Sequence, residues 1–108
     1  MVMIEAFVRP EKSDDILARL KEKGFAAATR MSVLGRGKQK GLKTADVYYD
    51  ELPKELLMLV VQDDQEQLVV DTILQSAKSK GEGAFGDGKI FVTAVSKAYT
   101  VSSGKAEL

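Results

Sequence analysis

The chain has 108 residues, with 16 Lys and Arg, 16 Asp and Glu, and neither Cys nor His. This length fits one domain with one modest core, and a formal net charge of zero gives no electrostatic reason to expect nucleic acid or membrane binding. Without Cys and His there can be no disulfide, no Cys-based zinc site and no His general base, so composition favours a binding module over an enzyme.

The N-terminal half begins with a predicted strand and helix. Hydropathy alternates with period two along residues 2–8, which is typical of a strand, and Pro10 should end its pairing. Ser13 is placed to cap a helix over about 13–23, which Gly24 should terminate. There is no signal-peptide pattern and no apolar run of membrane-spanning length, so we expect a cytoplasmic protein without membrane insertion.

The middle of the chain pairs a second strand with a long connection and an apolar strand. Residues 27–34 are predicted to form the strand. Residues 42–52 show no clean period and should be poorly ordered without a partner. Residues 56–61 are continuously apolar, which indicates a strand covered on both faces. Since two helices cover only one face of a sheet, the other face is buried either in an oligomer or under the C-terminal tail.

The last third repeats the strand–helix–strand pattern. Asp64 and Gln67 have the spacing of a capping box, which predicts a helix over about 64–79. Residues 89–95 form the predicted fourth strand, and 99–101 form a short fifth one. The βαββαβ order predicts one α+β, ferredoxin-like domain over residues 1–108. Its sheet is antiparallel, both helices lie on one face, and a long loop joins strands 2 and 3.

Two glycine-rich basic turns are the candidate ligand sites. The first is Gly35-Arg36-Gly37-Lys38-Gln39-Lys40-Gly41 and the second is Gly86-Asp87-Gly88-Lys89. Exposed amides beside cationic side chains suit a phosphate or carboxylate, although such runs are also common in plain solvated turns. The spacing Gly83-x-x-x-x-Gly88-Lys89 approaches a P-loop, but Ile90 stands where that motif needs Ser or Thr, and a strand follows instead of a helix.

Several residues, in these turns and in the loop after the first turn, admit two interpretations. Asp87 contacts an ion or ligand, or else bonds locally within its turn. Gln39 ligates a hard metal through its carbonyl oxygen, or else faces solvent. Tyr48 and Tyr49 either contact a partner or hold the end of the loop. The sequence offers no nucleophile–base pair.

Taken together, these segments resemble the PII family of nitrogen regulatory proteins over nearly the whole chain. The similar runs are Arg9-Pro10-Glu11-Lys12, the first glycine-basic turn, Leu52-Pro53-Lys54, and Gly86-Asp87-Gly88-Lys89-Ile90-Phe91-Val92. A shortened loop and the run 48–54 resemble the branch encoded in nitrogen-fixation clusters. The resemblance implies a homotrimer, or a larger assembly with a paralogue. It also implies ATP or ADP in clefts between subunits, and 2-oxoglutarate bound through Mg²⁺ and ATP.

The resemblance also assigns residues, within a ligand and effector loop over 35–54. It places Thr29 and Val60 beside adenine, Gln39 on Mg²⁺ and Lys54 on the oxoglutarate carboxylate. Ligand-loop and phosphate-turn positions are Gly35, Gly37, Lys38, Gly86, Asp87, Gly88 and Lys89. Two features depart from the family: Thr100 and Ser102 stand where it has arginines, and residues 78–85 form a segment about three residues longer than usual. These departures predict that nucleotide binding is weakened, altered or lost.

The resulting expectation is a non-enzymatic PII-like sensor of adenylate nucleotides and 2-oxoglutarate. It would control a target protein through residues 41–53, and the branch resemblance points to nitrogenase as that target. The alternative is a divergent PII-like protein that has lost or altered its nucleotide site and regulates another partner or binds another small ligand. A small enzyme on the same fold is the third, least favoured alternative.

Overall fold

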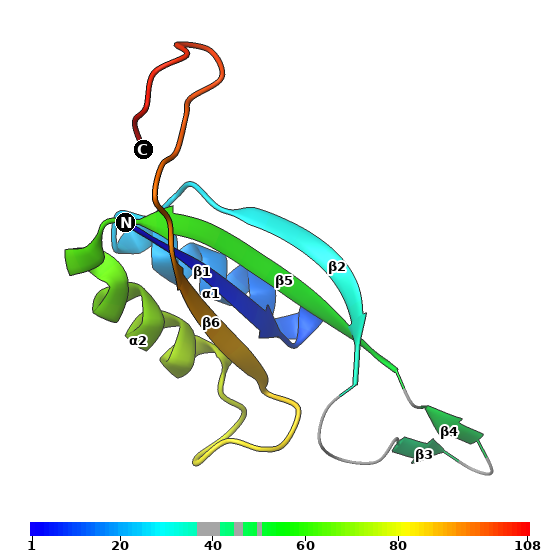
Figure 1. The fold of residues 1–108 in the computed structure, drawn as a ribbon. Coiled ribbons are helices and arrows are strands. Elements are labelled where there is room, and N and C mark those ends of the chain that lie inside the picture. Colours follow the sequence, from blue (N-terminus) through cyan, green and yellow to red (C-terminus); the bar gives the residue numbers. More distant parts are fainter. Residues whose placement is uncertain (37–41, 45–46, 50) are drawn as a thin grey trace.

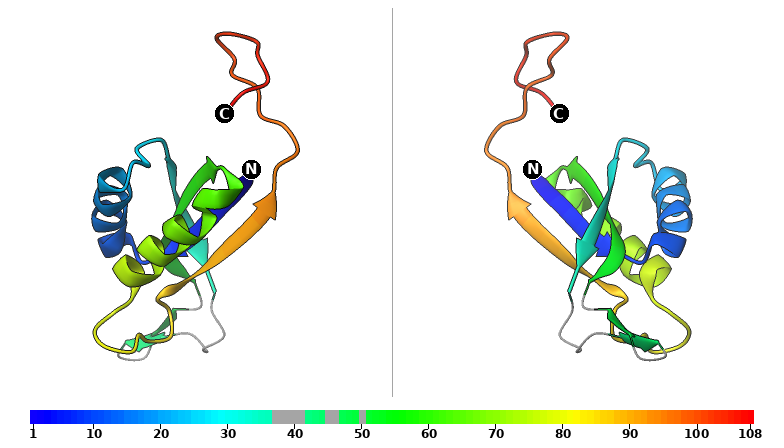
Figure 2. Two further views of the ribbon diagram at one scale, coloured as in Figure 1. Left: turned by 90° about the vertical axis from the view of Figure 1, so that its left-hand side faces the viewer. Right: turned by 90° about the vertical axis from the view of Figure 1, so that its right-hand side faces the viewer.

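The computed structural model describes residues 1–36, 42–44, 47–49 and 51–108. Its main sheet has four antiparallel strands in the order β2-β5-β1-β6: β1 is Val2–Val8, β2 is Thr29–Gly35, β5 is Leu52–Val61 and β6 is Gly88–Ala94. Helices α1 (Pro10–Glu22) and α2 (Glu66–Ala77) cover the same face (Figures 1 and 2). The predicted ferredoxin-like α+β fold is therefore confirmed.

The core lies between this face and the two helices. Alternation in β1 sends Ile4, Ala6 and Val8 inward, and all three are buried. They pack with buried side chains of β5 and of the two helices, including Ile16, Leu20, Leu57, Val69 and Ile73. The predicted strand over 2–8 is thus correct.

Both predicted helix starts need correction. Helix α1 begins at Pro10, not at Ser13, because a proline at the first position gives up only an N–H that has no partner there. Ser13 is buried inside the helix, where its hydroxyl donates to the Pro10 carbonyl over 3.0 Å. The predicted stop at Gly24 is correct, since this glycine has φ of +98° and the Phe25 N–H returns to the Leu20 carbonyl over 2.8 Å.

The capping box predicted before the second helix is made by Gln62 and Gln65, and not by Asp64 and Gln67. It opens a short 3₁₀ turn, η1 (Asp63–Gln65), that leads into α2. The Gln67 side chain instead donates to Asp71 one helical turn further on, over 2.9 Å. The predicted box had the right chemistry but was placed two residues too late.

The long connection contains regular structure that the sequence did not predict. Strands β3 (Leu42–Thr44) and β4 (Val47–Tyr49) form a separate antiparallel pair below the main sheet (Figure 1). Strand β5 begins at Leu52, four residues before the apolar run. That 42–52 is poorly ordered without a partner stays a prediction.

The C-terminal residues form a projecting arm, and the predicted fifth strand at 99–101 is absent from the described residues. Beyond Val95, whose N–H reaches the Met1 carbonyl, β1 has no residue left to pair with, so the chain leaves the sheet. A single bridge joins Tyr99 to Ala106, and the Thr100 N–H donates to the Lys105 carbonyl over 2.9 Å. The arm extends away from the body (Figure 1), so it does not cover the second face of the sheet.

The face of the sheet turned away from the helices carries a cluster of apolar side chains. The strand registers place Phe7, Leu56 and Met31 side by side across β1, β5 and β2. Met31 is 49% exposed and Phe91 is 48% exposed. Phe91 packs edge-on against Phe7, with the ring centroids 6.1 Å apart. We call this surface the open face.

Candidate functional site

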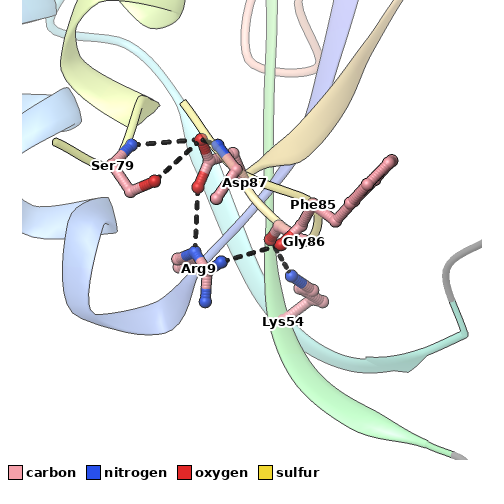
Figure 3. A network of polar contacts seen from close by, with 7 residues as sticks. Arg9, Lys54, Ser79, Phe85, Gly86 and Asp87 are labelled. Carbon is pink, nitrogen blue, oxygen red and sulfur yellow. Dashed lines mark hydrogen bonds and ion pairs between the residues drawn. The ribbon is translucent and has the colours of Figure 1, made fainter. Parts of the chain in front are cut away.

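The second glycine-basic turn is held in place by the carboxylate of Asp87 (Figure 3). One oxygen, Oδ1, accepts from Nε of Arg9 over 3.1 Å. The other, Oδ2, accepts from the backbone N–H and the hydroxyl of Ser79, each over 3.1 Å, and from the Ala84 N–H over 2.8 Å. The carboxylate thus ties the turn to the end of β1 and to the residues that follow α2.

Two cationic side chains also bind consecutive carbonyls of this turn (Figure 3). Arg9 donates from a terminal nitrogen to the Phe85 carbonyl over 3.0 Å, in addition to its bond with Asp87. Lys54 donates from Nζ to the Gly86 carbonyl. Because Lys54 belongs to β5 and Arg9 lies between β1 and α1, the turn is fixed from two separate elements.

Burial and hydrogen bonding at the turn shift two pKa values. Partial burial by itself raises the pKa of the Asp87 carboxyl, but the hydrogen bonds from Ala84, Ser79 and Arg9 outweigh it and hold this pKa well below its usual range. Partial burial, assisted by the nearby positive charge of Arg9, lowers the pKa of Lys54. The site thus holds an ionised carboxylate, and Arg9 lies close enough to Lys54 to disfavour the charged form of Lys54.

Gly88 joins the turn to β6 at a position that only glycine fits. Its φ is +129°, and a Cβ placed on it would lie 1.9 Å from the Phe7 carbonyl oxygen. The start of β6 therefore approaches the end of β1 more closely than any side chain permits. Lys89, the next residue, is exposed on the open face opposite Phe7.

The described ligand residues fall into two groups at opposite ends of the sheet. Gly35, Lys54 and the turn Gly86–Lys89 lie at the end where the long connection leaves the sheet. Here the Gly35–Leu52 pair closes the β2–β5 ladder. Lys54 lies against Gly35, whose added Cβ would be 3.6 Å from Lys54 Cγ. The positions Gly37, Lys38 and Gln39 lie outside the described residues.

Thr29 and Val60 form the second group, at the far end of the open face. Thr29 pairs with Met58, and Val60 pairs with Met3. Val60 and Lys54 are six residues apart on an extended strand, a separation of about 20 Å along it. The structure therefore separates the positions matched to adenine from the turn matched to phosphate within one chain.

Sequence reasoning missed three contributors to the turn: Arg9, Ser79 and Phe85. Arg9 was noted only as part of a motif, and its contact with Asp87 spans 78 positions, which local patterns do not show. Phe85 is 83% exposed beside the turn. Asp87 does bond locally, to Ala84 and Ser79, as one of its two interpretations predicted, and it also binds the distant Arg9. Within the described residues, no group of three acidic side chains could hold a metal ion, in a chain without His or Cys.

Comparisons with known proteins show the family of this chain. The sequence model of the family described as "Nitrogen regulatory protein P-II" matches residues 1–105. The chain is 54% identical over 101 residues to "Nitrogen fixation nifHD region glnB-like protein 1" of Methanococcus maripaludis, covering 94% of this chain and 93% of the relative. It is 44% identical over 108 residues to "Nitrogen fixation nifHD1 region GlnB-like protein 1" of Methanosarcina barkeri, covering 100% of both.

A bacterial relative shows similarity of the same extent. The chain is 37% identical over 111 aligned positions to "Nitrogen regulatory protein P-II 1" of Escherichia coli, covering 99% of this chain and 96% of the relative. No helix among the described residues is long and apolar enough to cross a membrane.

Proposed function

We propose, from the premise that this chain belongs to the nitrogen regulatory protein P-II family, that it senses adenylate nucleotides and 2-oxoglutarate and controls a target protein through residues 41–53. Proteins of this family are signalling regulators, so the chain is a non-enzymatic regulator. The observation that carries the proposal is the gathering of the Gly86–Lys89 turn, Lys54 and Gly35 where the long connection leaves the sheet.

Each predicted residue has a role in this proposal. Phosphate groups bind the backbone N–H groups of Gly86 and Gly88 and the ammonium of Lys89, because a glycine turn with a cation suits concentrated negative charge. Asp87 holds this turn in shape through its own hydrogen bonds. Gly35, Gly37 and Lys38 line the ligand from the first turn, and Lys54 binds the oxoglutarate carboxylate. Mg²⁺ is held by Gln39 and by oxygens of the bound ligands, since the described residues offer no acidic cluster for it.

The adenine positions support a site completed between subunits. Within one chain, Val60 lies about 20 Å along β5 from Lys54, and Lys54 binds the Gly86 carbonyl of the turn proposed for phosphate. An assembly of two or more chains brings one subunit's base-contacting residues toward another subunit's phosphate turn. The apolar open face is the surface such an assembly buries, and we propose a homotrimer or a larger assembly with a paralogue.

The proposed target is inferred from the names of the relatives. The relatives from Methanococcus maripaludis and Methanosarcina barkeri are named for nitrogen-fixation gene regions. We therefore propose that the target belongs to nitrogen fixation, with nitrogenase as the first candidate. Under this proposal residues 1–108 act as one cytoplasmic domain, and residues 35–54 transmit the state of the ligand site to the target.

The test is calorimetric titration with ATP, ADP and AMP, with and without Mg²⁺ and 2-oxoglutarate. The proposal expects saturable adenylate binding and tighter 2-oxoglutarate binding when Mg²⁺ and ATP are present. Lys89→Ala should weaken ATP binding at least tenfold, because it removes a cation at the phosphates. Lys21→Ala, an exposed lysine on α1, is the matched control and should bind as the original does. Equal affinities of the two variants would contradict the assigned turn.

One observation favours a second candidate function, a PII-like regulator with a lost or altered nucleotide site. Thr100 and Ser102 replace the two family arginines, and both lie in the projecting arm. If the titration detects no adenylate, this candidate takes the lead, and the ligand is another small anion or a protein partner.

A further inference from the structure

The Arg9 side chain contacts the Gly86–Lys89 turn through Asp87 and the Phe85 carbonyl. We call the side of the turn that Arg9 contacts its inner side, and the opposite side its outer side. Nε and one terminal nitrogen of Arg9 donate to Asp87 and to the Phe85 carbonyl, over 3.1 and 3.0 Å. The side chain is only 31% exposed, and that of Asp87 is 17% exposed. We propose that Arg9 is a positioning residue that sets the orientation of the Gly86–Gly88 amides through Asp87 and the Phe85 carbonyl, and that the Asp87 carboxylate is its fixed counter-ion and not a ligand of nucleotide or metal.

Planarity of the peptide bond gives the orientation. No described peptide bond is cis, so the Gly86 N–H points opposite to the Phe85 carbonyl, which faces Arg9. By the same argument the Asp87 N–H points opposite to the Gly86 carbonyl, which faces Lys54, and it donates to Ala84 over 3.2 Å. Arg9 and Lys54 thus hold two consecutive carbonyls on the inner side and leave the Gly86 N–H on the outer side.

Four hydrogen bonds reach the carboxylate of Asp87. Three of them, two from Ser79 and one from Ala84, go to Oδ2, and the fourth, from Arg9, goes to Oδ1. A metal ion or a ribose hydroxyl would have to compete with these donors, and phosphate would be repelled by the negative charge. The carboxylate therefore stabilises the shape of the turn, while the backbone and Lys89 are left for the anion.

Arg9 is well placed to fix this geometry because its own backbone is fixed. It is the residue between β1 and α1, with φ of −64° and ψ of 137°, and its carbonyl accepts the Lys12 N–H over 3.0 Å. Pro10 follows at the first helical position and restricts the backbone further. A guanidinium held by a strand end and a helix start thus acts as a rigid two-pronged support for the turn.

The experiment compares Arg9→Gln, Asp87→Asn, the double variant and Arg9→Lys with the control Arg19→Gln, which removes an exposed ion pair with Asp15. Amide hydrogen exchange at residues 86–89 is measured in the free protein, and ADP dissociation constants are measured by calorimetry. We expect exchange at 86–89 to be at least tenfold faster in Arg9→Gln and Asp87→Asn than in Arg19→Gln. We also expect ADP binding to be about tenfold weaker in both, and no more than threefold weaker again in the double variant.

Arg9→Lys separates positioning from simple charge. A lysine can pair with Asp87 but cannot bind two acceptors with a fixed fork, so we expect exchange at 86–89 to fall between the original and Arg9→Gln. The inference is overturned if Arg9→Gln matches Arg19→Gln in exchange at the turn, or if the two single effects on ADP affinity multiply in the double variant. The identity of the anion rests on the proposed function. If the original binds no adenylate, that function fails, and exchange at 86–89 alone decides the role of Arg9.

Discussion

Replacing Gly88 with alanine tests the close approach between β6 and β1. The new Cβ would lie 1.9 Å from the Phe7 carbonyl oxygen, and Cβ contacts below 3.0 Å are essentially never seen, so the strand end must move by about 1 Å. Two costs add. The first is the backbone at φ of +129°, which destabilises a residue with a side chain by about 1–3 kcal/mol. The second is the loss of one or two hydrogen bonds between β1 and β6, each of which contributes about 0.5–1.5 kcal/mol. We therefore expect a destabilisation of about 1.5–6 kcal/mol.

The assay is urea unfolding at a fixed protein concentration, because stability of an oligomer depends on concentration. Gly81→Ala is the matched control: Gly81 lies in the segment before the turn with φ of +72°, and its added Cβ meets nothing within 4 Å. It reports backbone strain without the clash. The reasoning requires Gly88→Ala to cost at least about 1 kcal/mol more than Gly81→Ala, in line with the lost ladder bonds. Equal midpoints for the two variants would refute it.

Three further predictions concern assembly, acid stability and nucleotide preference. Met31→Glu on the open face should dissociate the oligomer in sedimentation velocity. The control Leu68→Glu on α2, at a similar 46% exposure, should leave the oligomer intact. If the original protein is a monomer, the proposed assembly is ruled out. Because the pKa of Asp87 is lowered on folding, its stabilisation is present above about pH 3.9, the unfolded value, and is lost as the pH falls from there toward the folded value. Asp87→Asn should therefore cost about 1.5–3 kcal/mol at pH 7 in urea unfolding and progressively less below pH 4; a difference that does not shrink in acid would contradict this. Thr100→Arg with Ser102→Arg should raise calorimetric affinity for ATP more than for AMP, since ATP carries more phosphate charge; equal gains would mean that the arginines do not meet the phosphates.

Local patterns were sufficient for the elements whose residues repeat on one face. Alternation in β1, the apolar stripes of the helices and the stop at Gly24 are recorded in neighbouring residues, so the sequence by itself determined the βαββαβ order and the ferredoxin-like fold. It placed the helix starts less well, because Pro10 and Ser13 both suit a helix start and only the packing of Ser13 inside the helix decides between them. The pair β3–β4 was missed because three-residue strands are too short to show a period.

The candidate site also has residues that the sequence predicted and contacts that only the tertiary structure decided. The glycines and Lys89 of the turn were predicted as ligand residues from their residue types, and Lys54 was predicted from the family resemblance. Only the tertiary structure decided which groups hold the turn, since Arg9 and Asp87 are 78 positions apart and meet because β1 pairs with β6. The same pairing brings Gly88 against Phe7, and the β2–β5 and β1–β5 pairings place Thr29 and Val60 at the opposite end of the open face. Contacts between distant segments depend on strand order and register, and no local stretch of residues contains that information.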